Sequence, residues 1–172
     1  QVFIQDSLIS GFTDIKSGKG EWKERHFDSG TVYLVFKNNS TIIENFHFQS
    51  DNDFLQLSGN FDGVSNYQID RIQLAHKNNY LVNAKPVFFE LKDSNIKVKP
   101  FEFHINDGLM EGVITKNQNI EGTFKMSNFD AAVLTQFIDD ERLKMTGLIF
   151  GEVLIETNNE DFDIDVDLSF KN

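Results

Sequence analysis

The sequence predicts a mostly-β chain that folds as one long, curled antiparallel sheet. Three observations predict this fold. Apolar and polar residues alternate in run after run, turn formers separate the runs at intervals of about 8–12 residues, and proline occurs only at Pro86 and Pro100. The clearest run is "DFDIDVDLSFK" at 161–171, where every even position is apolar and every odd position is charged or polar. A period of two is typical of a strand with one apolar face.

The other predicted strands follow the same rule. Each run alternates, or is rich in the β-branched and aromatic residues that favour strands. In chain order the runs are TVYLVFK (31–37), ENFHFQ (44–49), FLQLSGNF (54–61), VFFELK (87–92), IKVKPFEFHI (96–105), LMEGVIT (109–115), IEGTFKM (120–126) and GLIFGEVLIE (147–156). The segments between them, such as KNNS, SDND, KDSN and ETNNED, supply the Asn, Asp and Ser that turns prefer, which predicts antiparallel hairpins.

One segment departs from the period of two. In NFDAAVLTQFIDDERL (128–143) the apolar residues recur at helical spacing, Asp130 can cap a helix, and two alanines follow it. We therefore expect one short helix near residues 130–139, with four apolar residues on one face: Val133, Leu134, Phe137 and Ile138. The sequence leaves open whether this helix plugs a groove of the sheet or packs outside it.

An internal repeat is visible at an offset of 55 residues. Residues 32–48, VYLVFKNNSTIIENFHF, align without a gap on residues 87–103, VFFELKDSNIKVKPFEF. The strand–turn–strand pattern extends over 32–61 and 87–116, and a weaker third copy lies at 153–170. We therefore expect residues 1–172 to be a single β-rich segment of a longer, repeat-like protein.

The composition argues against several classes of function. A net charge of -11 disfavours binding to nucleic acids and to anionic membrane surfaces. The lack of cysteine excludes disulfides, thiolate metal sites and thiol catalysis. The chain also lacks a P-loop and the G-x-S-x-G motif, and its four histidines do not have metal-ligand spacing. We expect a protein that is not an enzyme and that needs no cofactor or metal.

The aspartates of the last run allow two chemical alternatives; they are Asp161, Asp163, Asp165 and Asp167. The spacing resembles the start of a calcium loop, but Val166 stands where that loop needs glycine and Asn172 where it needs glutamate. Paired carboxylates also occur in glycoside hydrolases, but one Trp and three Tyr supply few platforms for a sugar. On a strand these carboxylates lie in a line about 6.6–6.8 Å apart. The preferred interpretation is a solvated face that discourages edge pairing.

Two answers compete for what covers the apolar faces. Two sheets can close face to face as a β-sandwich, which would suit an adhesin or a protein-interaction module. Alternatively, one long sheet curls into an open trough whose apolar concave face shelters an acyl chain. Each CH₂ removed from water is worth about 0.8 kcal/mol, so a sixteen-carbon chain needs on the order of ten kcal/mol of shelter to cross an aqueous space.

The trough is also what a family resemblance implies. Residues 80–138, from YLVNAKPVFFEL to VLTQFI, resemble the strands and short helix of the TamB (translocation and assembly module) branch of the AsmA-like bridge proteins of Gram-negative bacteria. Residues 143–172 resemble that family's glycine-spaced strand pair. The resemblance implies a β-taco with an apolar groove, and movement of phospholipid between the inner and outer membranes in outer-membrane biogenesis. It also implies a periplasmic location, an inner-membrane anchor outside this segment, and an Omp85-type outer-membrane barrel as a partner.

The trough interpretation identifies its own lining residues. The repeats contribute Phe46, Phe48, Phe101, Phe103 and Ile105. The last strand contributes Phe162, Ile164, Val166, Leu168 and Phe170. The aspartates of that strand are then expected on the convex wall, in water. Phospholipid acyl chains are the expected ligands, and catalytic and metal-binding residues are not expected.

Overall fold

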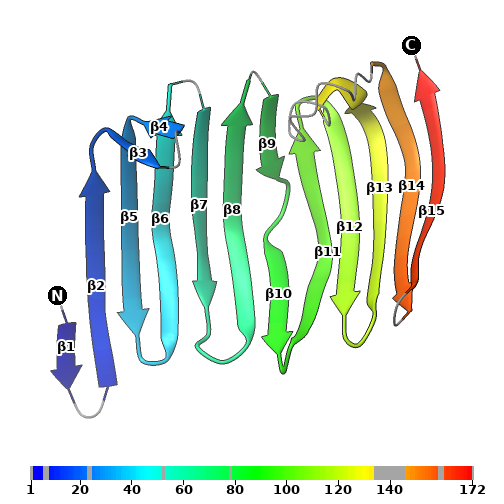
Figure 1. Ribbon diagram of the computed structural model, residues 1–172. Helices are drawn as coiled ribbons and strands as arrows, with labels where there is room; N and C mark the ends of the chain where they lie inside the picture. Colours follow the sequence, from blue (N-terminus) through cyan, green and yellow to red (C-terminus); the bar gives the residue numbers. More distant parts are fainter. Residues whose placement is uncertain are drawn as a thin grey trace.

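The computed structural model describes residues 2–5, 8–22, 25–51, 53–77, 79–133, 146–158 and 161–171. Over these ranges the chain forms one antiparallel sheet of thirteen strands and a separate two-stranded ribbon (Figure 1). The strands are β1 (Val2–Gln5), β2 (Leu8–Ser17), β3 (Gly20–Trp22), β4 (Arg25–Phe27), β5 (Ser29–Lys37), β6 (Ser40–Ser50), β7 (Asp53–Phe61), β8 (Asn66–His76), β9 (Asn79–Asn83), β10 (Val87–Lys92), β11 (Asn95–Ile105), β12 (Gly108–Lys116), β13 (Ile120–Asp130), β14 (Leu148–Asn158) and β15 (Asp161–Lys171).

Neighbours in sequence are neighbours in the sheet. The order is β1-β2-β5-β6-β7-β8-β10-β11-β12-β13-β14-β15, with β9 between β8 and β11 and with the β3–β4 ribbon inserted between β2 and β5. Among the described strands, the extensive contacts are between hydrogen-bonded neighbours. Strand β4 of the ribbon also makes a small contact with β6. The sheet is therefore a single layer (Figure 1), and the residues that the structure describes do not form the two facing sheets of a sandwich.

Strands β9 and β10 are two halves of one interrupted strand. Both pair with β8 and β11, at successive positions along them, and residues 84–86 with Pro86 separate the halves. The buried side chain of Asn83 fills the interruption. It accepts a hydrogen bond from the N–H of Ile72 (2.7 Å). It also donates to the carbonyls of Asp70 (3.0 Å) and Lys85 (2.9 Å), so backbone groups beside the break keep partners.

The prediction of a mostly-β chain with one long sheet is confirmed. Each predicted run lies within a strand, except that the run 147–156 begins one residue before β14. Strands before residue 29, and β8 and β9, were not among the predicted runs. The predicted helix begins where expected, because residues 131–133 are helical and the Ala132 N–H donates a hydrogen bond to the Asp130 carboxylate (2.9 Å). The rest of that prediction, from Leu134 to residue 139, lies outside the described residues.

The segments 32–61 and 87–116 have matching strand geometry. β6 and β7 have the same bounds as β11 and β12 when the numbers are shifted by 55 residues. In both pairs the register shifts at the same place, after Ile43 in β6 and after Val98 in β11. The turns before these strands also agree, since Asn38 and Asp93 have positive φ angles of 55° and 49°. The two segments therefore share strand length, bulge position and turn geometry, while segment 153–170 spans parts of β14 and β15.

Candidate functional site

Strand register divides the sheet into two faces. Val166 of β15 pairs with Val153 of β14, and Val153 pairs with Phe124 of β13. Because directly paired residues point to the same side of a sheet, this row continues through Gly112 to Phe101. We call the side that carries these residues the inner face, and the opposite side the outer face.

The inner face is apolar on every strand of the sheet from β2 to β15. Its large apolar residues are Ile15, Val32, Leu34, Phe36, Ile43, Phe46, Phe48, Leu55, Leu57, Phe61, Tyr67, Ile69, Ile72, Leu74, Leu81, Val87, Phe89, Leu91, Ile96, Val98, Phe101, Phe103, Ile105, Met110, Ile114, Ile120, Phe124, Met126, Phe129, Ile149, Val153, Ile155, Ile164, Val166, Leu168 and Phe170. Its polar residues lie mainly near strand ends, as Asp53, His76 and Lys116 do. The apolar surface therefore runs across the strands without interruption.

The residues predicted to line a groove lie on this inner face. Register places Phe46, Phe48, Phe101, Phe103 and Ile105 there, together with Ile164, Val166, Leu168 and Phe170. For Phe162 the structure describes only the backbone, which pairs with Thr157. The side chains of Asp163, Asp165 and Asp167 are exposed on the outer face. The last strand therefore has one apolar and one acidic side.

Much of the inner face is open to solvent. At the β15 edge Ile164, Val166 and Phe170 are 48%, 53% and 55% exposed. In the middle of the sheet the side chains are half-buried because they pack on their neighbours across the strands. Phe61, Tyr67 and Phe89, on β7, β8 and β10, stack with ring centroids 4.3 and 4.7 Å apart and nearly parallel planes. Side-chain packing within one layer, without a second sheet, produces this partial burial.

The glycines of the sheet share the inner face, and several of its strands contain bulges. The sheet glycines all lie on this side: Gly11, Gly30, Gly59, Gly108, Gly112, Gly122 and Gly151. The ring of Phe101 lies over Gly112, where an added Cβ would come within 2.6 Å of it. Register shifts bend the strands at several places, one of them opposite Gly151, whose φ is 141°. Small residues and bends on one side favour a sheet that is concave on that side.

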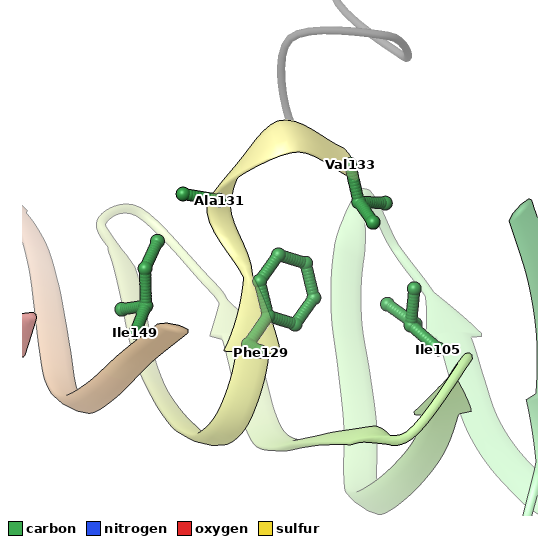
Figure 2. Close-up of a cluster of buried hydrophobic side chains, with 5 residues drawn as sticks. All are labelled: Ile105, Phe129, Ala131, Val133 and Ile149. Carbon is green, nitrogen blue, oxygen red and sulfur yellow. The ribbon is translucent and has the colours of Figure 1, made fainter. Parts of the chain in front are cut away.

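The helical turn packs on the inner face at one end of β11, β13 and β14. Phe129, Val133 and Ile149 are 2% or less exposed, and they cluster with Ile105 and Ala131. Figure 2 shows the turn of residues 131–133 folding back so that Val133 lies above Ile105, with the Phe129 ring beside them. At the same end of the strands in Figure 1 the β3–β4 ribbon approaches β6, where the rings of Phe27 and Phe48 are 5.3 Å apart. The start of the predicted helix therefore packs on the inner side of the sheet.

Titratable groups with shifted pKa values lie at turns and strand ends. Burial alone would raise the pKa of Asp53, but the hydrogen bond to His76 (Nδ1 to Oδ2, 2.7 Å), the Lys77 N–H and the nearby positive charges outweigh it, so this pKa is lowered. The Asp62 pKa is lowered far below its usual range by hydrogen bonds from the Asn66 side chain and from backbone N–H groups of its own loop. In the described ranges, groups of three or more His, Asp or Glu able to hold a metal ion are absent. Both carboxylates therefore have structural partners.

Part of the inner face was not found from the sequence. Tyr67, Ile69, Ile72 and Leu74 of β8 lie on it, but the residue Asp70 is an extra one in the pairing with β7. This bulge shifts the period of two in mid-strand, so the apolar positions change from odd to even. The sequence signal for β8 is a pair of short alternations of opposite phase, Tyr67 with Ile69 and then Ile72 with Leu74.

No family model, no curated protein and no solved structure matches this chain. The described residues also contain no helix that is long and apolar enough to cross a membrane.

Proposed function

We propose that this chain is a non-enzymatic, lipid-conducting segment whose inner face carries phospholipid acyl chains. One observation supports the proposal most directly: a single-layer sheet with an uninterrupted apolar face that its own described residues leave largely uncovered. At about 4.8 Å per strand the face extends roughly 50 Å across the sheet. That is longer than the ~30 Å hydrocarbon core of a bilayer, so a whole acyl chain can lie on it.

The chemistry of the face suits acyl chains. Contact with apolar side chains returns about 0.8 kcal/mol for each CH₂ removed from water, wherever along the face the chain lies. A ligand can therefore slide from one strand to the next without a large change in energy. Charged residues of the inner face lie near strand ends, which suits a ligand whose headgroup remains in water.

The proposal places the chain in a TamB-type bridge. In that setting the segment belongs to a periplasmic protein of a Gram-negative bacterium, anchored in the inner membrane by a part outside this sequence. Its partners are phospholipid and an Omp85-type outer-membrane barrel, and its role is in outer-membrane biogenesis. The alternation of 161–171 and the glycine-bearing strand pair 147–171 are the features that suggest this setting.

Site-specific photocross-linking in cells tests the proposal. A photoreactive residue at Ile164 or Val166 is expected to capture phospholipid, whereas the same residue at Asp163 or Asp165 is not. The four positions lie on one strand, so the comparison is between the two faces of β15. Equal lipid capture from both faces, or none from either, would contradict the proposal, and capture of protein alone from the inner face would support an interaction module instead.

A substitution at the same place gives a second test. Ile164→Asp puts an unpaired carboxylate on the path of the acyl chain, which costs several kcal/mol while it stays charged. Because Ile164 is already 48% exposed, the sheet is expected to survive this change. Lipid transfer between vesicles should slow, and Asp165→Ala, on the outer face, should leave it unchanged.

A further inference from the structure

The two ends of the inner face differ along the same strands. At one end the helical turn packs on β11, β13 and β14, where Phe129 and Ile149 are 2% exposed or less. At the other end, the lower one in Figure 1, Leu91 of β10 and Ile120 of β13 are each 36% exposed. The lower end of the inner face is therefore the more accessible of the two.

A cation interrupts the apolar residues at this lower end. Strand pairing places Leu91, Ile96, Lys116 and Ile120 in a row across β10, β11, β12 and β13, and we call this row the lower rim. In the described sheet, Lys116 is the single lysine or arginine whose register puts it on the inner face. It is exposed, so its stem can lie along the neighbouring isoleucines while its ammonium stays in water.

The charge of Lys116 has no acidic partner in the part of the chain that the structure describes. The ion pairs found there involve other residues. The inner face also carries Asp53 and His76, but these lie at the opposite end of the strands and are hydrogen-bonded to each other (2.7 Å). The positive charge at the lower rim is therefore available to a ligand.

The internal repeat indicates that packing does not require this charge. The shift of 55 residues aligns β7 with β12 and puts Phe61 at the position of Lys116. Phe61 stacks on Tyr67, with ring centroids 4.3 Å apart. Because an apolar residue completes the equivalent strand end, the fold explains the position of Lys116 but not its charge.

A polar hollow follows Lys116 at the end of β12. It has a volume of about 470 Å³ and is lined by Asn95, Asn117, Gln118, Asn119 and Glu121. Side-chain amides both donate and accept hydrogen bonds, whereas a carboxylate only accepts. This hollow therefore suits the neutral or cationic part of a headgroup, and the ammonium of Lys116 suits an anionic part.

The length of β12 allows a lipid to lie along it. The strand has nine residues and extends about 26 Å from Lys116 to its other end. An acyl chain occupies half of a ~30 Å hydrocarbon core, about 15 Å, so tails that begin at Lys116 would end near the level of Gly112. At that level Gly112 pairs with Phe101 on one side and Phe124 on the other. The tails therefore stop short of the buried cluster at the helical turn.

We propose that Lys116 binds the phosphate of a glycerophospholipid and so fixes the orientation of the lipid on the inner face. The headgroup lies at the lower rim, beside the polar hollow, and the acyl chains extend along the strands toward the helical turn. This inference rests on the proposed function, because the apolar face has to hold the tails. Contacts of the tails are alike across the strands and do not by themselves set an orientation, whereas the charge pair at Lys116 does.

Two lipids with the same acyl chains test the role of the charge. The probes are dioleoyl phosphatidylethanolamine and dioleoylglycerol, which lacks the phosphate, each competing with a fluorescent fatty acid for the 172-residue chain. Phosphatidylethanolamine carries no net charge, so the net charge of -11 on the protein does not bias the comparison. The wild type should bind it about tenfold more tightly than dioleoylglycerol, as expected for one charge-assisted hydrogen bond.

Substitutions at Lys116 should remove this preference without removing lipid binding. Lys116→Gln should weaken phosphatidylethanolamine about tenfold and leave dioleoylglycerol unchanged, and Lys116→Arg should retain the preference. The matched control is Lys97→Gln, because Lys97 is exposed at the same end of the neighbouring strand β11 but on the outer face. This control should change either affinity by less than about twofold. Inorganic phosphate in excess should not release bound phosphatidylethanolamine, and release would indicate a site for free anions instead.

Photoreactive lipids test the orientation. A phosphatidylethanolamine with the reactive group at the end of an acyl chain should label residues at the level of Phe101 and Phe124. The same lipid with the reactive group on its headgroup should label the turn 117–119. The reverse pattern, or the same pattern from both lipids, would overturn the proposed orientation.

The outcomes distinguish this inference from the proposed function. If neither lipid binds, the proposed function fails and this inference fails with it. If both lipids bind with equal affinity, or if Lys116→Gln and Lys97→Gln have the same effect, the inner face still holds acyl chains but Lys116 does not select the headgroup. Either of these last two results would overturn the present proposal alone.

Discussion

Phe129→Ala tests whether the buried cluster around the helical turn stabilises the end of the sheet. Phe129 is 2% exposed and contacts a cluster that includes Ile105, Val133 and Ile149 (Figure 2). Removing a buried phenylalanine side chain costs about 3–5 kcal/mol, depending on how well the cavity collapses. Met110 and Met126 border the cluster and are flexible, so we expect the lower end of this range, about 3 kcal/mol.

Native-state hydrogen exchange at the amides of β13 and β14 measures this effect. A loss of about 3 kcal/mol corresponds to exchange roughly 150-fold faster. Phe170→Ala provides the control, because Phe170 lies on the same face but is 55% exposed, and its loss should cost only about 1 kcal/mol. If the two substitutions had equal effects, the helical turn would not be fastening the sheet through this cluster.

Two further predictions concern acid stability and glycine. Because the folded-state pKa of Asp53 lies below its ordinary value of 3.8, its interaction with His76 stabilises the protein above that pH, and the stabilisation is lost as the pH falls through the folded-state pKa. The free energy of unfolding, measured with urea, should therefore fall less between about pH 5 and pH 2 in Asp53→Asn than in the wild type. An equal fall in the two proteins would contradict this. Gly59→Ala would bring a Cβ to 2.2 Å from the Gln68 carbonyl oxygen, and it should destabilise the protein by about 1–3 kcal/mol. Gly18→Ala is the control, because its Cβ would have nothing within 4 Å, and it should change stability by less than about 0.5 kcal/mol. Thermal melts of the two alanine variants provide the comparison, and equal shifts would show that backbone proximity at Gly59 is unimportant.

The strands could be predicted where the period of two is continuous. In β15 the alternation holds for the whole strand, and Asn and Asp residues mark the hairpin before it. In β8 the extra residue Asp70 reverses the phase, and in β9 the strand ends after five residues, ahead of Pro86. A bulge is a property of two paired strands, so the reversed phase within β8 identifies a bulge only once its pairing with β7 is known.

The composition of the inner face could be predicted, but its surroundings could not. Alternation assigns Phe101 and Phe103 to one side of β11 whether or not a second sheet covers them. Only the pairing of every strand with its neighbours distinguishes one open layer from two closed ones. The start of the helix could be predicted, because the Asp130 cap depends on neighbouring residues alone. The packing of Val133 in one cluster with Ile105 could not, because it depends on segments far apart in sequence.

In this sheet the extensive contacts join neighbouring strands, so each strand is stabilised mainly by the strands beside it. Among the described strands, an interior strand such as β7 pairs with two neighbours, and β15 pairs with one. Within the described sheet, local unfolding is therefore expected to cost least at the outermost strands and to progress inward one strand at a time. Local opening energies that rise from the edges toward the centre are therefore expected beside the free energy of global unfolding.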